Sequence, residues 1–153
     1  MDEEVARGRR TIPRPRQTVI PRPRLEDRLR DGGEKVVLAA PSGCGKTTLL
    51  LQVGEHFARR GHNVVWVDAR DLRQRGRLDA DVLLVDGVDP KNFAKAARQM
   101  DEWLAAAGRG RVFTATERLH SGPPRGWDLV GEDDLRFAEA EMVRLTRALG
   151  VSL

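Results

Sequence analysis

The fold of this chain follows from one stretch, VVLAAPSGCGKTTLLLQ, at residues 36–52. The apolar run at its start, residues 35–40, predicts a strand that is covered on both faces, as in a parallel sheet. Residues 46–60 predict a helix, because apolar side chains recur on one face and Gly61 follows as a stop signal. A buried strand, a glycine-rich loop and an amphipathic helix together form the structural context of a phosphate loop.

The loop has the form A-x-x-x-x-G-K-T from Ala40 to Thr47, one residue away from the strict phosphate-loop pattern. Gly43 and Gly45 allow a tight backbone that turns N–H groups inward around an anion, and the following helix N-terminus adds partial positive charge. Lys46 is expected to reach the β- and γ-phosphates, and Thr47 is expected to bind Mg²⁺. The residues predicted to bind the nucleotide from this loop are Pro41, Ser42, Gly43, Cys44, Gly45, Lys46, Thr47 and Thr48.

Asp86 ends a second apolar run, DVLLVD at residues 81–86. An acid in this position of a phosphate-loop protein holds Mg²⁺ through its water shell, and the alternative is an ordinary capping or turn aspartate. Gly87 stands where many nucleotide-hydrolysing enzymes have a second acid, and glycine has no side chain that can orient a water molecule. Asp89 before Pro90 is explained as a helix N-cap followed by proline at the first helical position.

Arg118 follows a strand predicted at residues 111–116. A well-placed arginine near the γ-phosphate raises hydrolysis by roughly 10³–10⁵-fold, and the alternative is a surface arginine on a loop. Thr114 or Thr116, on the same strand, is a candidate to bind the γ-phosphate or the attacking water. The candidate catalytic residues are therefore Lys46, Asp86 and Arg118, and the candidate Mg²⁺ ligands are Thr47 and Asp86.

Strands and helices alternate along the rest of the chain. Further strands are predicted at residues 63–68, 82–86, 111–116 and 127–130. Further helices are predicted at residues 25–33, from Asp89 to residue 107, and at 138–149. This alternation predicts an α/β fold of the P-loop NTPase type, with a mainly parallel sheet of about five strands and helices on both faces.

The net charge of +4 comes from the N-terminal arm, residues 1–24. The arm has seven arginines and three acidic residues, whereas residues 25–153 have 20 basic and 20 acidic residues. The globular part therefore gives no electrostatic indication of nucleic-acid binding. The arm contains IPRPR twice, which favours extended backbone, and it is either a solvated linker or a segment that packs beside a ligand site. We divide the chain into this arm and a nucleotide-binding domain at residues 25–153.

A chain of 153 residues that is 40% hydrophobic and 33% charged is suited to one globular domain rather than to a disordered segment. It has no apolar run of about 18 residues and no apolar signal segment at its start, so we expect neither a membrane span nor secretion.

Cys44 is the only cysteine, which excludes an internal disulfide and suits a cytoplasmic protein. Its place near a helix N-terminus favours a thiolate and a redox role, and the alternative is a small residue tolerated in the loop.

Several segments of the chain resemble a known family when they are taken in order. These segments are TVIPRPRLEDRL, VVLAAPSGCGKTTLLLQ, VVWVD, VLLVDGVD and DLRFAEAE. Their order resembles the ATPase domain of large LuxR-type, maltose-activator-like regulators, which belong to the STAND class of signal-transduction ATPases. The resemblance extends from about Thr18 to Leu149, and its more specific parts are the lead-in before the phosphate loop and the last segment.

The resemblance implies a P-loop domain in which another strand separates the acid-bearing strand from the first strand. It implies ATP or ADP as the nucleotide, with Arg22 near the base or the phosphates. Lys46 and Thr47 would hold phosphate and Mg²⁺, Asp86 would be the metal acid, and Arg118 would approximate the sensor arginine of the family.

The chain also departs from this family, including a short segment after TATERLH and the two differences that follow. The family usually has two consecutive acids where this chain has Asp86 and Gly87. Only 12 residues, Ala69 to Ala80, lie between the second and third strands, where the family has a longer helical segment. The missing second acid weakens the expectation of efficient hydrolysis.

We therefore expect an ATP- or ADP-binding domain that acts as a nucleotide-dependent signalling switch, with weak or absent ATPase activity. One alternative is a small P-loop phosphotransferase, although no arginine-rich lid follows the third strand. Another is a non-enzymatic interaction module that uses the basic arm. The expected partners are the nucleotide and a protein partner or a second copy of the chain, and direct DNA binding has no support because no DNA-reading motif accompanies the arm.

Overall fold

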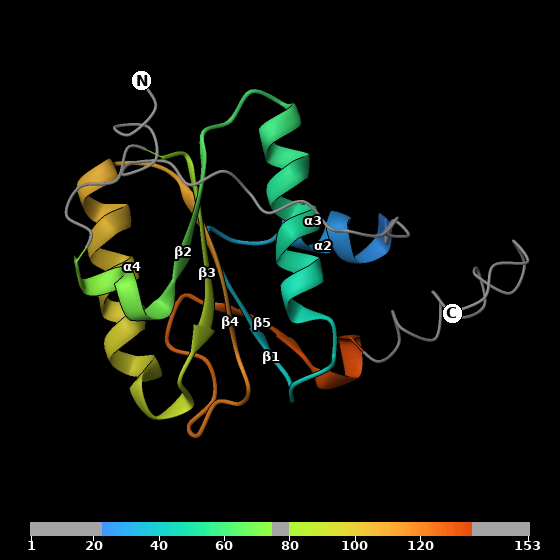
Figure 1. The fold of residues 1–153 in the computed structure, drawn as a ribbon, viewed down its shortest axis with the longest axis vertical. Helices are drawn as coiled ribbons and strands as arrows, with labels where there is room; N and C mark the ends of the chain where they lie inside the picture. The colour runs from blue at the N-terminus through green and yellow to red at the C-terminus, as the bar shows by residue number, and fades with distance from the viewer. Residues whose placement is uncertain (1–22, 75–79, 136–153) are drawn as a thin grey trace, which may run out of the picture.

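Figure 1 shows the computed structural model, which describes residues 23–74 and 80–135. Arg22, with most of the N-terminal arm, and the helix predicted at residues 138–149 lie outside the described residues. Within the two described ranges, no helix is both long enough and apolar enough to cross a membrane.

The centre of the fold is a sheet of five parallel strands in the order β2-β3-β4-β1-β5. In chain order the strands are β1 (Lys35–Ala39), β2 (Val64–Asp68), β3 (Val82–Val88), β4 (Arg111–Thr116) and β5 (Asp128–Gly131). β4 lies between β1 and β3, so another strand separates the acid-bearing strand from the strand that leads into the phosphate loop. The sheet confirms the predicted α/β fold and has the strand order that the resemblance implied.

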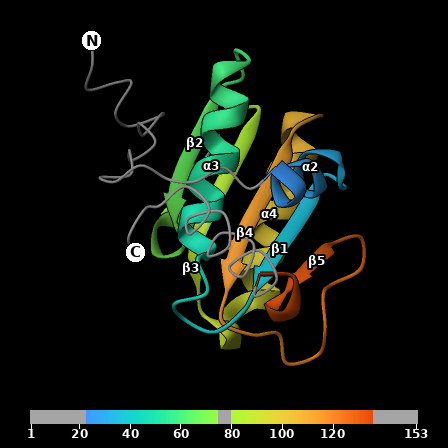
Figure 2. The ribbon, with the colours of Figure 1, turned by 90° about the vertical axis from the view of Figure 1, so that its right-hand side faces the viewer.

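Helices cover both faces of the sheet, as predicted. α2 (Pro23–Asp31) and α3 (Lys46–Arg59) lie on one face, and α4 (Phe93–Ala107) lies on the other (Figure 1). Figure 2, turned by 90°, shows α3 in front of the sheet and α4 behind it. Two short 3-10 helices, η1 (Ala69–Gln74) and η2 (Pro90–Asn92), lie in the connections that follow β2 and β3.

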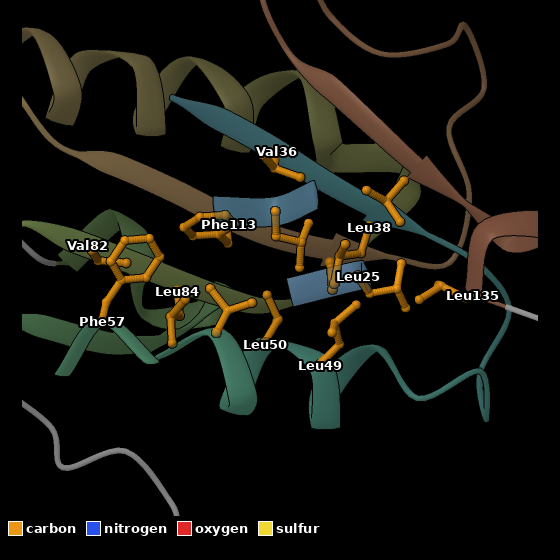
Figure 3. Close-up of a cluster of buried hydrophobic side chains, with 14 of the residues drawn as sticks. Leu25, Val36, Leu38, Leu49, Leu50, Phe57, Val82, Leu84, Phe113 and Leu135 are labelled. Carbon is orange, nitrogen blue, oxygen red and sulfur yellow. The ribbon is translucent and has the colours of Figure 1, made fainter. Parts of the chain in front are cut away.

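Each face of the sheet has its own hydrophobic cluster. Because side chains alternate along a strand, Val36 and Leu38 belong to the cluster under α2 and α3, whereas Val37 belongs to the cluster under α4. Figure 3 shows the first cluster, in which Leu49 and Leu50 of α3 pack against the strands. None of these five side chains is more than 1% exposed, and full burial of such a side chain contributes about 1.5–3 kcal/mol. The helix that follows the phosphate loop is therefore firmly packed against the sheet.

Arg111, at the start of β4, fixes the carboxyl end of α2 to the sheet. Its guanidinium donates hydrogen bonds to the carbonyl oxygens of Leu29 at 2.6 Å and Gly33 at 2.9 Å, and also to those of Arg30 and Gly32. A helix end leaves its last carbonyl groups without intrahelical partners, and here one arginine satisfies several carbonyls at and just beyond that end. Burial in this position lowers the pKa of Arg111 from its ordinary value.

The structure shifts several predicted boundaries by one or two residues, and β3 and α2 show the clearest changes. β3 continues past Asp86 to Val88, because Val88 is buried and pairs with Thr116 beyond a bulge. The helix predicted at residues 25–33 is α2, which begins at Pro23 because proline is well tolerated in the first turn of a helix. The connection from β2 to β3 begins with η1, in place of the longer helical segment of the resembled family.

Candidate functional site

The phosphate loop joins β1 to the N-terminus of α3. Gly43 and Gly45 have φ angles of 89° and 81°, a left-handed conformation that residues with a side chain rarely adopt. Gly45 is the N-cap of α3, so the loop presents backbone N–H groups and the positive end of a 14-residue helix at the same place. Ala40, where the strict motif has glycine, is 1% exposed, and its N–H donates to the carbonyl oxygen of Thr116 at 3.1 Å. A small residue is sufficient at that position.

Thr47, in the first turn of α3, contacts Asp86 near the end of β3. The Thr47 hydroxyl donates a 2.8 Å hydrogen bond to Oδ2 of Asp86, and the N–H of Gly87 donates a 2.9 Å hydrogen bond to Oδ1. These two contacts orient both oxygens of the carboxylate. Gly87 is exposed and has a φ angle of 73°, so glycine at this position suits the bulged backbone of β3.

A pocket of about 740 Å³ lies at the carboxyl edge of the sheet, and this pair of residues is part of its lining. Its lining includes residues 86–90, residues 115–117 and six residues of the phosphate loop: Ser42, Gly43, Gly45, Lys46, Thr47 and Thr48. In Figure 1 the loops that follow β1, β3 and β4 lie together at the lower end of the sheet. The tertiary structure thus brings most of the predicted loop residues together with Asp86.

The other predicted site residues lie elsewhere. Pro41 and Arg118 line a neighbouring cavity of about 560 Å³. Cys44 is half-buried and packs against the hydrophobic cluster under α3, and Arg22 lies outside the described residues. Arg118 is therefore absent from the lining of the phosphate-loop pocket, whereas its neighbour Glu117 lines both cavities.

Lys46 folds back onto its own loop. Its ammonium donates to the carbonyl oxygen of Ala40 and, at 3.1 Å, to that of Pro41. Phosphate oxygens are stronger acceptors for the ammonium than these neutral carbonyls, because they carry negative charge and add a direct Coulomb attraction. When an anion enters the loop, the lysine can therefore exchange its hydrogen bonds to the carbonyls for stronger ones to the anion.

The two threonines considered for phosphate or water binding hold β4 to β3. The hydroxyl of Thr114 donates to the carbonyl oxygen of Val85, and that of Thr116 donates to the carbonyl oxygen of Val88, both at 2.8 Å. Thr114 is 0% exposed and Thr116 is 2% exposed. Their hydroxyl protons are committed to the sheet, so neither is offered to a ligand.

Asp89 has the capping role that the sequence predicted. Its carboxylate accepts a 3.0 Å hydrogen bond from the N–H of Lys91, with Pro90 at the first position of η2. This carboxylate lines the phosphate-loop pocket, but its hydrogen bond belongs to the backbone of η2.

Sequence reasoning missed Glu117, the first residue after β4. Its Oε1 accepts a 3.2 Å hydrogen bond from the hydroxyl of Ser42, and it lines the same pocket as Asp86. The available signal was an acid directly after an apolar strand, the pattern that selected Asp86. The resemblance implied a strand between the first strand and the acid-bearing strand without saying which one, and the sheet order shows that this strand is β4.

The oxygen atoms of Thr47 and Asp86 fit Mg²⁺. A hydroxyl and a carboxylate are hard oxygen ligands, and Mg²⁺ is usually bound by one or two protein groups together with water and substrate phosphates. In the described part of the chain, no group of three or more His, Cys, Asp or Glu side chains could hold a metal ion. A site that depends on phosphate for its remaining ligands therefore suits these residues better than a site made of protein alone.

The strand order, the phosphate loop at the N-terminus of α3 and the acid on β3 define an α/β domain of the P-loop NTPase type. The chain belongs to the AAA domain family, whose model matches residues 2–147.

The chain is similar to the serine/threonine-protein kinase PknK of Mycobacterium tuberculosis (strain ATCC 25618 / H37Rv), with 30% identity over 115 residues. This match covers 72% of the chain but 10% of the kinase, so the chain spans about a tenth of the length of this relative.

Two solved structures of DnaA show the same fold at 20% identity. AMPPCP-bound DnaA from Aquifex aeolicus has a TM-score of 0.53, and the match covers 90% of this chain and 55% of that chain. The replication initiator DnaA bound to AMPPCP and single-stranded DNA has a TM-score of 0.55, with 84% of this chain and 50% of that chain covered.

Proposed function

We propose that this chain binds ATP and ADP together with Mg²⁺ and acts as a nucleotide-dependent regulatory switch that hydrolyses ATP slowly. The observation that carries the proposal is the convergence of three features on one pocket: the N-terminus of α3, Lys46, and the hydrogen-bonded pair of Thr47 and Asp86. The helix end and the ammonium supply positive charge for a polyphosphate, and the oxygen pair suits the cation that accompanies it.

Each residue has a role in this proposal. The loop N–H groups and Lys46 bind the phosphates, and Thr47 and Asp86 hold Mg²⁺, which neutralises charge on the β- and γ-phosphates when it is bound. Arg118 contacts the γ-phosphate from the neighbouring cavity, and Arg22 lies near the base or the phosphates, as in the resembled family.

Hydrolysis is expected to be slow because Gly87 follows Asp86. A positioned base contributes roughly 10²–10⁴-fold to the rate of a step that includes proton transfer, and glycine supplies none. Gly87 is exposed and left-handed, and it has no side chain that could orient the attacking water.

A switch fits these features better than a metabolic enzyme. A γ-phosphate and its Mg²⁺ order nearby segments in many nucleotide switches, and that ordering is lost on hydrolysis. The resemblance to the STAND class of regulators favours such a role, and the similar protein PknK is named as a protein kinase, which is a signalling enzyme. The DnaA structures with AMPPCP, an ATP analogue, favour a nucleotide as the ligand of this fold.

The proposal keeps the division into an arm at residues 1–24 and a nucleotide-binding domain at 25–153. It places the protein in the cytoplasm. It expects a protein partner or a second copy of the chain as the further partner. The single-stranded DNA of the DnaA structure is not carried over, because the similarity concerns the fold and residues 25–153 have equal numbers of basic and acidic residues.

Titration calorimetry with ATP and with ADP, in the presence of Mg²⁺, tests the proposal. We expect both nucleotides to bind the wild type and neither to bind Lys46→Ala, whereas Lys95→Ala, an exposed control on α4, should bind like the wild type. Phosphate release should fall below the range typical of enzymes, about 1–10³ s⁻¹. Absence of binding, or binding that Lys46→Ala leaves intact, would overturn the nucleotide site, and rapid turnover would overturn the slow switch.

A further inference from the structure

The carboxylates of β3 and its following turn are already engaged. Thr47 and the N–H of Gly87 orient the two oxygens of Asp86. Asp89 accepts from the N–H of Lys91 and caps η2. Because the proposed function assigns Asp86 to Mg²⁺ and Asp89 caps η2, a carboxylate from another element is the stronger candidate to accept a proton from water.

β4 supplies an acid next to the end of β3. The register pairs Val85 with Thr114 and Val88 with Thr116, so β3 has one more residue than β4 between these pairs. This bulge brings the end of β4 level with Val88, and the hydroxyl of Thr116 fixes it there by its 2.8 Å hydrogen bond. Glu117 follows at once, beside the end of β3.

The carboxylate of Glu117 faces the phosphate loop. Its Oε1 accepts a 3.2 Å hydrogen bond from the hydroxyl of Ser42, and it shares the pocket lining with Lys46 and Asp86. An ionised carboxylate has roughly four acceptor positions, so the contact with Ser42 leaves room for a water molecule. The side chain is exposed, which leaves it free to turn toward a bound nucleotide.

We propose that Glu117 is the catalytic base of the slow ATP hydrolysis, in place of the missing acid at position 87; this inference rests on the proposed function. The oxygen of a water molecule attacks the γ-phosphorus, and the bond from the γ-phosphorus to the bridging oxygen breaks. The electron pair of that bond leaves with ADP, and one water proton passes to the Glu117 carboxylate, which later releases it to solvent. The products are ADP and inorganic phosphate. A long exposed side chain orients water less rigidly than an acid on a buried strand, which agrees with slow turnover.

The test compares the wild type with Glu117→Gln and Glu117→Asp. Phosphate release at saturating ATP gives kcat, and titration calorimetry gives Kd for ATP and for ADP. We expect Glu117→Gln to lower kcat by at least tenfold, which is less than the roughly 10²–10⁴-fold contribution of a well-positioned base because the exposed side chain orients water loosely. Kd for both nucleotides should stay within about threefold, and Glu117→Asp should keep part of the rate because it keeps the carboxylate. Glu102→Gln, an exposed site on α4, is the matched control and should behave like the wild type.

Three results would overturn the proposal. One is equal kcat for the wild type and Glu117→Gln. Another is wild-type turnover no faster than that of Lys46→Ala. The third is tighter ATP binding by Glu117→Gln at unchanged kcat, which would show that Glu117 repels the γ-phosphate and does not act as a base. In each case nucleotide binding that depends on Lys46 would leave the nucleotide site itself intact.

Discussion

Oγ1 of Thr47 and Oδ2 of Asp86 lie 2.8 Å apart, although 39 residues separate them in the chain. The contact joins the first turn of α3, the helix that follows β1, to a residue near the end of β3, and β1 and β3 lie on either side of β4 in the sheet. The hydroxyl and the carboxylate are therefore close enough together to hold the phosphate-bound Mg²⁺ of the proposed function. The first prediction follows from this pair.

Asp86→Asn should remove the effect of Mg²⁺ on nucleotide binding. The amide keeps the shape of the side chain but loses the charge that attracts the cation, so ATP affinity in Mg²⁺ should fall by about tenfold or more. The measurement is ATP titration with Mg²⁺ and with EDTA. Asp89→Asn is the matched control, because Asp89 lines the same pocket and asparagine keeps its capping role. Mg²⁺-dependent binding by Asp86→Asn, or brisk hydrolysis by Asp86→Ala, would contradict the metal assignment.

Gly87→Asp should speed hydrolysis and lower stability. A Cβ at this position meets no atom within 4 Å, so the added carboxylate has space beside Asp86. The φ angle of 73° is left-handed, which costs about 1–2 kcal/mol for a residue with a side chain, although aspartate and asparagine tolerate it best. We expect phosphate release to rise by roughly tenfold or more and the free energy of unfolding in urea to fall by about 1 kcal/mol.

Gly87→Asn separates the two effects of that substitution. It carries the same backbone strain and nearly the same shape without a carboxylate. It should lose the same stability as Gly87→Asp while its rate of phosphate release stays at the wild-type value. Equal rates for the two variants would show that the gain does not come from the acid.

Arg111→Met should destabilise the fold. The substitution keeps much of the apolar stem but leaves carbonyl groups at the end of α2 without a donor, and hydrogen bonds from a charged group contribute about 1.5–3 kcal/mol. We expect the free energy of unfolding in urea to fall by about that amount. Arg109→Met, an exposed site in the turn before β4, should change it little. Arg111→Lys should recover only part of the loss, because an ammonium cannot span several carbonyls as the guanidinium does. Wild-type stability in Arg111→Met would contradict this role.

The sequence by itself determined the α/β class and, within the described residues, most of the helices and strands. Apolar runs of strand length alternating with helical periodicity gave the α/β type, because burial on both faces of a parallel sheet requires that pattern. Glycines at 43 and 45 gave the phosphate loop, since their left-handed backbone is a local property. The capping role of Asp89 was equally local, because an N-cap and its N–H lie within two residues of each other.

Tertiary structure alone decided which side chains meet. Thr114 and Thr116 were ligand candidates from the sequence, but in the folded sheet their hydroxyls donate to the carbonyl groups of Val85 and Val88. Arg118 and Glu117 are neighbours in the chain, yet only Glu117 lines the phosphate-loop pocket.

The physical reason is that strand order and register depend on long-range packing and on backbone pairing between β3 and β4. Short-range periodicity carries no information about either. The sequence thus determined that a phosphate loop and a carboxylate strand exist, and the sheet determined which acid stands beside them.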